Sequence, residues 1–288
     1  PAGYILPPLG YWETKNLSLL AISAVESIGL ALIGVFFMKE QFEIRQKRYD
    51  ESLLVVENQL TAFGSLRSIV AKEWLELRRS GSLAPAVMGF SGHLLAIYLV
   101  SWLFQSGFGI PIGFNVVFFS GFVGFMGVMT YSFLTNLEHN EYLNVMPVSV
   151  ESVVKAKLSI YFVLTSGITV LYVVMIGFLK NQMHLVPMGL FVAASTSLFV
   201  VAVTAYLTGL WTNTMFFSAK TLLKFTAIVV PPLTAIEIGT VFMEFLPDFS
   251  MKLIYGTSGL LFVVSIVVFR SLGNKWKGVT FSYVSTGV

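Results

Sequence analysis

Two carboxylates lie inside long apolar stretches of the sequence, where an ionised group is costly. Glu26 lies within residues 17–38, and Glu237 lies within residues 225–245. On insertion scales, a charged carboxylate at the centre of a bilayer costs about 2.5 to 3.5 kcal/mol. We therefore expect each side chain either to line a path for protons, cations or a substrate, or to be protonated and hydrogen-bonded to a neighbouring helix. For Glu237, a place near the outer membrane interface is a further interpretation.

A pair of prolines, Pro231 and Pro232, lies in the same apolar stretch as Glu237. Proline has no backbone N–H and removes hydrogen bonds from a helix interior. Inside a membrane span, such a break is tolerated where neighbouring groups supply replacement contacts. The pair predicts a kink or a partly unwound segment, which would act either as a gating hinge or as a static bend.

The residue types argue against enzyme chemistry in this chain. The sequence has no cysteine, which excludes disulfides, thiolate metal sites and a cysteine nucleophile. Its three histidines, His93, His139 and His184, are scattered and lack the spacing of metal ligands. No G-x-x-x-x-G-K-[ST] phosphate loop occurs. We predict a non-catalytic protein with no metal site and no directly bound cofactor.

The most informative polar segment is residues 136–158, which reads NLEHNEYLNVMPVSVESVVKAKL. Pro147 disfavours helical geometry at Met146. Ser149 is a good N-cap, and Glu151 would lie in the first turn of the following helix, where a negative charge is favourable. The pattern predicts a short helix, a stop at Pro147 and a second helix after Ser149.

The short helix before Pro147 is predicted to have an apolar side and an acidic side. Tyr142, Leu143 and Met146 lie on the apolar side. Glu138 and Glu141 lie on the acidic side. A projecting segment of this kind suits the groove of a partner protein, and the alternative is a plain turn at the membrane surface.

A second amphipathic stretch, SLRSIVAKEWLELRRSGS, precedes a long apolar run. Apolar residues recur in it at helical spacing, at Leu66, Ile69, Val70, Trp74 and Leu77. Charged residues, among them Arg79, occupy the remaining faces. The pattern predicts a helix that lies flat in the membrane interface, or alternatively a solvated linker helix.

These segments are positioned by elements that the composition identifies as membrane spans. Of the 288 residues, 56% are hydrophobic and 11% are charged, and the mean hydropathy is +0.80. Soluble domains carry about 25% charged residues, so a water-soluble protein, a disordered chain and a nucleic-acid-binding protein are all excluded.

A helix needs roughly 20 apolar residues to cross a bilayer. Seven runs of that length occur, at residues 17–38, 87–105, 112–134, 158–179, 185–208, 225–245 and 252–270. We predict an all-α integral membrane protein, a polytopic bundle of seven transmembrane helices.

The positions of the basic residues predict the orientation of this bundle. Of the 18 Lys and Arg residues, only Lys15, Lys180 and Lys252 fall on one side of the predicted spans, and the other 15 fall on the opposite side. Basic loops remain cytoplasmic. The N-terminus is therefore predicted outside and the C-terminus inside the cell, with the protein integral to the plasma membrane.

The segment around Pro147 resembles the membrane subunits of type-2 ABC exporters. The matching residues occur in order: Glu141, Leu143, Met146, Pro147, Val148, Ser149 and Lys157. The surroundings are similar too, because an amphipathic stretch precedes the first of six spans and the Pro147 segment follows the second. The resemblance covers roughly residues 66–277 and implies a six-span permease core.

The resemblance implies that this chain forms the permease and that a separate chain hydrolyses ATP. Segment 138–152 would be the coupling helix that docks on a separate ABC ATPase subunit, which binds ATP and Mg. Its expected contact residues are Glu138, Glu141, Tyr142, Leu143, Met146, Pro147, Ser149 and Glu151. The interfacial stretch would be the elbow helix, with Glu73, Trp74, Arg78 and Arg79 as its marked residues. The permease would pair as a homodimer or with a related half.

The chain is expected to divide into four parts. Residues 1–50 hold the extra span and its basic flank, and residues 51–86 hold the linker and elbow helix. Residues 87–277 form the six-span core, and residues 278–288 form a cytoplasmic tail. Seven spans are one more than such a unit needs. We therefore expect the chain to be the C-terminal part of a longer tandem permease, or alternatively a permease with an added N-terminal anchor.

Two other functions remain open at this point. The first alternative is a structural or anchoring membrane subunit of a larger complex, whose cytoplasmic loops bind a partner without ATPase activity. A secondary transporter driven by ions through Glu26 and Glu237 is the remaining alternative, although no inverted repeat supports it. In every case membrane lipid is a partner and nucleic acid is not.

Overall fold

A computed structural model of the chain describes residues 53–104, 114–136 and 148–279, together with five positions between residues 21 and 29. The chain divides into two compact units, residues 1–50 with 102–111 and residues 51–101 with 112–288. Nearly all described residues belong to the second unit, where they are helical with no strand. Apart from those five positions, the predicted extra span at residues 17–38 lies outside the described residues.

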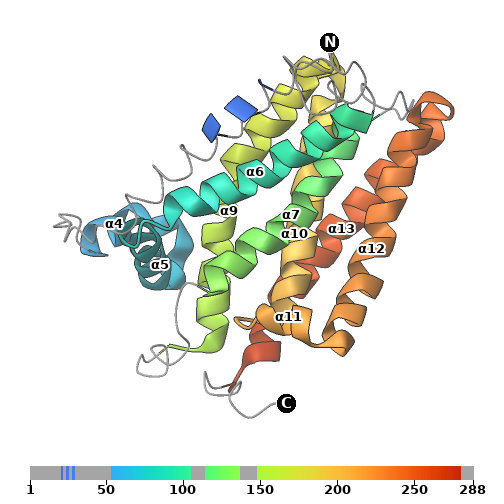
Figure 1. Cartoon of the computed structure of the whole chain (residues 1–288). Coiled ribbons are helices and arrows are strands. Elements are labelled where there is room, and N and C mark those ends of the chain that lie inside the picture. The colour runs from blue at the N-terminus through green and yellow to red at the C-terminus, as the bar shows by residue number, and fades with distance from the viewer. Residues whose placement is uncertain are drawn as a thin grey trace. The chain divides into compact units, whose positions relative to one another are not determined.

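Six helices of the described part are long and apolar enough to cross a membrane, as expected of a polytopic integral membrane protein. They are α6 (Leu83–Trp102), α7 (Val116–Asn136), α9 (Val150–Leu179), α10 (Val186–Thr208), α12 (Ala219–Val241) and α13 (Pro247–Trp276) (Figure 1). The short 3-10 helices η3 (Met183–Leu185) and η4 (Phe242–Glu244) connect α9 to α10 and α12 to α13. Six of the predicted spans are thus confirmed.

Two of these helices extend well beyond the predicted spans. The α9 and α13 helices have 30 residues each. The predicted span begins at residue 158, inside the helix that is predicted to start after Ser149. The helix begins at Val150, as predicted, and the Ser149 side chain accepts a hydrogen bond from the backbone N–H of Ser152. The predicted N-cap is therefore confirmed.

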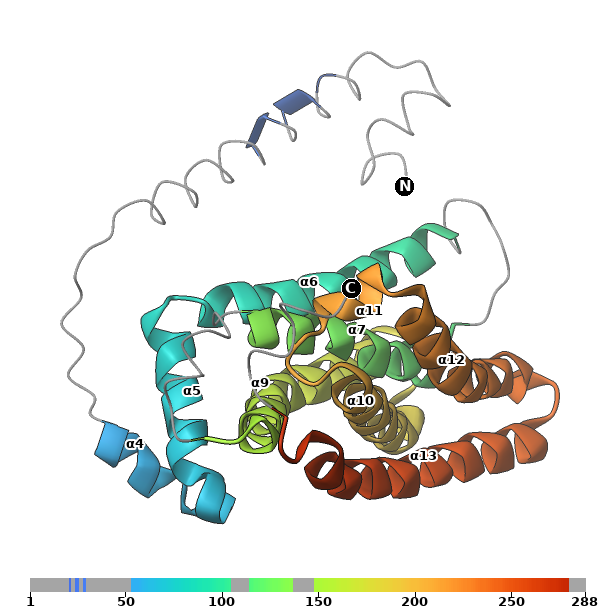
Figure 2. The ribbon, with the colours of Figure 1, turned by 90° about the horizontal axis from the view of Figure 1, so that it is seen from below.

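The central helix of the bundle is α10, which contacts α7, α9, α12 and α13 (Figure 2). In its most apolar stretch 72% of the residues are buried, against 17% for α6. Four of its five Ser and Thr hydroxyl groups donate to carbonyls of the same helix, as when Thr204 donates to the Val200 carbonyl at 2.8 Å, and the fifth, Ser197, bonds to the Tyr161 hydroxyl of α9 at 2.6 Å. Because these polar groups are satisfied within the protein, α10 can be enclosed by other helices without a desolvation penalty.

A glycine allows the closest approach of α10 to α7. A Cβ atom at Gly124 would lie 2.5 Å from the backbone carbonyl carbon of Thr196 and 2.7 Å from the backbone nitrogen of Ser197. Any side chain at this position would therefore push the two backbones apart. Small residues at helix interfaces permit this kind of packing in membranes, where close contact rather than water exclusion drives association.

Four shorter helices lie outside the spans: α4 (Leu53–Gln59), η1 (Thr61–Leu66), α5 (Arg67–Arg79) and α11 (Asn213–Phe217). The α5 helix is the predicted amphipathic stretch. It packs against α4 through Ala71 and Leu75, and Val70 and Leu77 belong to the cluster that includes α9. Figure 1 places α5 at one end of the bundle. We call this the α5 end; it also holds the C-terminal ends of α7, α10 and α13 and the N-terminal end of α9.

The prolines of α12 do not unwind it. The helix runs from Ala219 to Val241 with Pro231 and Pro232 inside it. Of the two predicted alternatives, the partly unwound segment is therefore not found, and the kink stays a prediction. Each proline lacks only its own backbone N–H, so the remaining hydrogen bonds and the contacts with α7, α10 and α13 keep the helix continuous.

Candidate functional site

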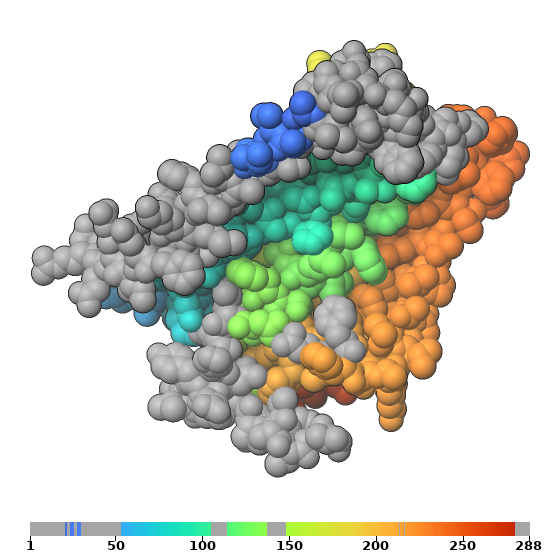
Figure 3. Space-filling model, in the orientation of Figure 1, coloured from blue at the N-terminus to red at the C-terminus, as the bar shows by residue number. Residues whose placement is uncertain are grey.

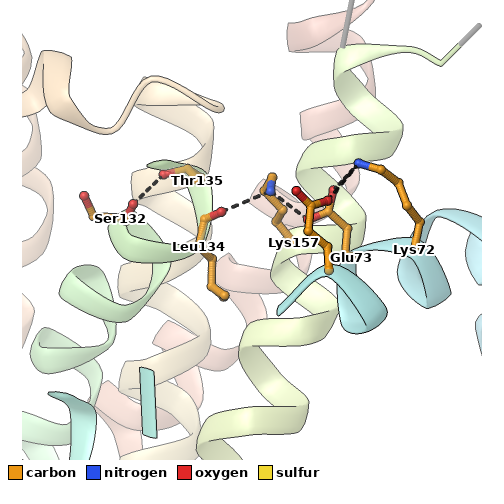
Figure 4. Close-up of polar contacts among 7 residues, drawn as sticks. Lys72, Glu73, Ser132, Leu134, Thr135 and Lys157 are labelled. Carbon is orange, nitrogen blue, oxygen red and sulfur yellow. Dashed lines mark hydrogen bonds and ion pairs between the residues drawn. The ribbon is translucent and has the colours of Figure 1, made fainter. Parts of the chain in front are cut away.

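An ion pair buried at the α5 end connects three helices. The Nζ atom of Lys157, on α9, lies 2.7 Å from Oε2 of Glu73, on α5. The same Nζ atom donates a hydrogen bond of 3.0 Å to the backbone carbonyl of Leu134, in the last turns of α7 (Figure 4). Only 2% of the Lys157 side chain and 8% of the Glu73 side chain are exposed. A single ammonium group therefore joins α5, α7 and α9.

A second lysine lies on the outer side of Glu73. The Nζ atom of Lys72 is 3.8 Å from Oε1 of Glu73 and 3.3 Å from Oε2 of Glu76 (Figure 4). Glu73 thus lies between two ammonium groups, one buried and one partly exposed. This arrangement offsets much of the cost of burying a carboxylate, which amounts to several kcal/mol for an unpaired ion.

The local sequence explains why both charges are turned inward. Glu73 follows Val70 by three positions and precedes Leu77 by four, so it shares a helix face with two buried apolar residues. Lys157 lies between two buried neighbours, Ala156 and Leu158, more than one turn inside α9. Each charge is held in an apolar environment by the packing of its own helix, which makes each the natural partner of the other.

The ion pair lies close to both ends of residues 137–147, the segment between α7 and α9. The Leu134 carbonyl belongs to the last helical turns before residues 137–147, and Lys157 belongs to the first turns after them. The described residues on both sides of that segment are therefore joined through one side chain, and α5 is joined to both. A displacement of the N-terminal end of α9 would move α5 and the C-terminal end of α7 with it.

A cluster of hydroxyl groups connects the same end of α7 to the segment after α10. The Oγ1 atom of Thr212 lies 3.0 Å from Oγ of Ser132 and 2.8 Å from Oγ1 of Thr135. All three side chains are buried or partly buried. These short bonds hold the end of α7 against the link between α10 and α11.

Two aromatic side chains fix the C-terminal end of α10. The Tyr131 hydroxyl donates to the Gly209 carbonyl at 2.9 Å, and Nε1 of Trp276 donates to the Ala205 carbonyl at 3.1 Å. Gly209 has a φ of +59°, and a Cβ atom there would lie 2.7 Å from Cζ2 of Trp276. Glycine is required at this turn for both reasons, the backbone conformation and the space.

Of the eight predicted coupling residues, the structure describes two. Ser149 caps α9, as stated above. Glu151 forms an ion pair of 2.5 Å with Lys155 on the same helix. A Cβ atom at Gly273 of α13 would come within 2.6 Å of Oε1 of Glu151, so this side chain also packs against α13. The other six lie outside the described residues: Glu138, Glu141, Tyr142, Leu143, Met146 and Pro147.

The other predicted elbow residues have different environments. Trp74 is partly buried and packs against the apolar clusters on both sides of α5. Arg78 and Arg79 are exposed in the last turn of α5. Positive charges at this position interact favourably with the negative end of the helix dipole. The apolar stripe predicted through Leu66 and Ile69 is only partly buried, because α4 covers a neighbouring face of α5 instead.

Among the predicted pathway residues, Glu237 is described and Glu26 is not. Glu237 lies on α12 opposite Gly121 of α7, where an added Cβ atom would overlap its Oε1. Its Oε2 atom is buried and has no hydrogen-bond partner in the described part of the chain. The expected hydrogen bond to a neighbouring helix is therefore not found there. Within the described ranges, no group of three or more His, Asp or Glu side chains is arranged to hold a metal ion.

Comparison with known proteins identifies no family for this fold. No model of a protein family matches the chain, and searches of curated proteins and of solved structures found no match.

Proposed function

We propose that this chain is the transmembrane permease subunit of an ATP-driven exporter of the type-2 ABC class. It would form the substrate pathway and would pair with a second copy or a related half. ATP and Mg would be bound by a separate ATPase subunit that contacts segment 138–152. The six spans and the order of α5, α6, α7, residues 137–147 and α9 agree with the sequence resemblance.

The observation that carries this proposal is the connection made by Lys157. A permease driven by a separate ATPase needs a way to convert movement at one loop into movement of its spans. The bonds from Lys157 to Glu73 and to the Leu134 carbonyl would supply it. When the ATPase pushes residues 137–147, α7 and α9 would tilt together, and α5 would follow them. The pathway would then open toward the other side of the membrane.

Isolation of the native complex tests the proposal. The chain would be tagged, extracted in mild detergent and purified with its companions, and we expect an ATP-binding subunit in stoichiometric amount. The variant Glu141→Ala with Met146→Ala should lose most of that subunit. Lys252→Ala provides the matched control, since Lys252 lies on α13 near the opposite end of the bundle.

Each other outcome assigns a different role. Stoichiometric recovery of a partner without an ATP-binding site would support the anchoring function instead. Transport in purified vesicles that follows a proton gradient and ignores ATP would support the ion-coupled transporter. If the double variant recovers as much ATPase subunit as the wild type does, segment 138–152 does not contribute to the contact.

A further inference from the structure

The space between α7 and α12 forms a pocket of about 230 Å³, whose mainly apolar wall contains one carboxylate, Glu237, and one hydroxyl group, Thr234. Phe122 and Phe125 contribute from α7, and Val230 and Leu233 contribute from α12, as does Glu237. No basic residue lines the pocket. In Figure 3, α7 and α12 are visible on the same face of the molecule.

Among the residues that the structure describes, none is a polar partner of the Glu237 carboxylate in this wall. Its Oε2 atom is buried, and no hydrogen bond or ion pair reaches it from the described residues. A buried polar atom with no partner is uncommon in folded proteins and calls for an explanation, which can be a missing ligand. Inside a membrane span the argument is stronger, since no bulk water is present to solvate the group.

The glycine opposite Glu237 is what leaves room for this arrangement. Any Cβ atom at Gly121 would overlap Oε1 of Glu237. The carboxylate is therefore packed directly against the α7 backbone, and its position in the pocket is fixed by both helices. Glu237 lies about two turns, or roughly 10 Å, from Glu244 at the end of η4. The pocket is thus nearer to the opposite end of the bundle than to the α5 end.

The chemistry of the pocket selects one class of ligand. A mainly apolar wall favours an organic molecule over a hydrated metal ion, because its described side chains offer only the Glu237 carboxylate and the Thr234 hydroxyl as oxygen ligands. A single negative charge in that wall favours a ligand with one positive charge. Phenylalanine rings attract organic cations as well, through the negative faces of the rings. A volume of about 230 Å³ suits a small aromatic or alkyl ammonium ion.

We propose that the pocket between α7 and α12 binds a hydrophobic organic monocation, whose charged nitrogen pairs with Glu237. This inference deepens the proposed permease function by naming the class of substrate. Binding is a property of this chain alone and does not require ATP, so it is tested separately from the identity of the energy source.

Benzyltrimethylammonium is a suitable probe, since it combines one aromatic ring with one permanent positive charge. The full chain, with any subunits that co-purify, would be placed in lipid nanodiscs without ATP. Binding of the radiolabelled cation would be measured by equilibrium dialysis, with empty nanodiscs as the blank. We expect saturable binding that unlabelled cation displaces and that benzenesulfonate, an anion of similar size, does not.

Substitutions in and near the pocket test whether the Glu237 carboxylate binds the cation. Glu237→Gln preserves the shape of the side chain and removes the charge, and it should weaken binding by about 30-fold or more. Glu237→Asp keeps the charge and should retain part of the affinity. Phe125→Leu should weaken binding by about fivefold through loss of a ring face. Glu244→Gln, outside the pocket on η4, is the matched control and should bind as the wild type does.

Several outcomes would overturn the proposal. They are absence of saturable binding to the wild type, equal displacement by benzenesulfonate, and unchanged affinity in Glu237→Gln. Recovery of an ATPase with a chain that fails these tests would leave the permease function in place and remove only the substrate class.

Discussion

Lys157 and Glu73 are separated by 84 positions in the sequence, and their side chains meet at 2.7 Å with almost no exposure to solvent. Lys157 also holds the Leu134 carbonyl of α7. Three helices therefore meet at one charged atom, at the end of the bundle where α7 ends and α9 begins.

The first prediction concerns the stability of this contact. Lys157→Met leaves the Glu73 carboxylate buried without its closest partner and should lower the free energy of unfolding by about 3–5 kcal/mol. Replacing both residues by Met removes the unpaired charge as well. The double variant should lie within about 1 kcal/mol of the wild type, the remaining loss being the bond to the Leu134 carbonyl. Unfolding in increasing SDS compares the wild type with the two variants, and a double variant that loses as much stability as Lys157→Met would contradict this explanation.

The second prediction separates folding from coupling. The variant with Met at both positions should fold and retain its ATPase subunit, because neither residue lies in segment 138–152. Without the connection, however, transport should fall by about tenfold or more relative to ATP hydrolysis. The control is Glu57→Gln with Arg67→Gln, which removes an ion pair of 2.9 Å whose Arg67 side chain is half exposed. Exposed pairs contribute about 1 kcal/mol at most, so this control should transport normally.

The third prediction concerns the turn after α10. Gly209→Ala should destabilise the protein by about 2 kcal/mol or more, because the backbone conformation is unfavourable for alanine and the methyl group would strike Trp276. Gly259→Ala is a matched substitution in the middle of α13, with open space around the added methyl. It should be neutral or slightly stabilising, since alanine favours helices. Thermal unfolding of the two variants in the same detergent gives the comparison, and equal midpoints would contradict the role assigned to Gly209.

The fourth prediction concerns orientation in the membrane. Because the sequence has no cysteine, single cysteine variants can be labelled without a background. His184→Cys lies in η3 at the end of the bundle opposite α5, and Ser80→Cys lies just after α5. The distribution of basic residues predicts that a membrane-impermeant maleimide labels the first in intact cells and the second only after permeabilisation. The reverse pattern would invert the proposed topology.

Whether the sequence could predict a feature of this structure depends on how far apart in the sequence the interacting residues are. The six spans follow from local composition, because the length of an apolar run is set by the thickness of the bilayer. The cap at Ser149 is equally local. The start of α9 directly after Ser149 follows from the sequence as well, whereas the inward turn of Lys157 to Glu73 does not.

The ion pair itself could be anticipated only in part. Glu73 stands on an apolar helix face between Val70 and Leu77, which is a visible sign of a buried carboxylate, but its partner is 84 positions away. The contacts of Tyr131 with Gly209 and of Gly121 with Glu237 are equally remote in sequence. No pattern within one segment specifies them, because they arise from the packing of one helix on another.

The lengths of α9 and α13 have a consequence for the surrounding membrane. At 30 residues each, these helices extend for about 45 Å, whereas the hydrocarbon layer is about 30 Å thick. Helices that exceed this thickness tilt, and the tilt changes when the lipids are shorter or longer. Because Lys157 attaches α5 to α9, a change in acyl-chain length would shift α5 as well. The activity of this protein should therefore depend on the thickness of the bilayer that holds it.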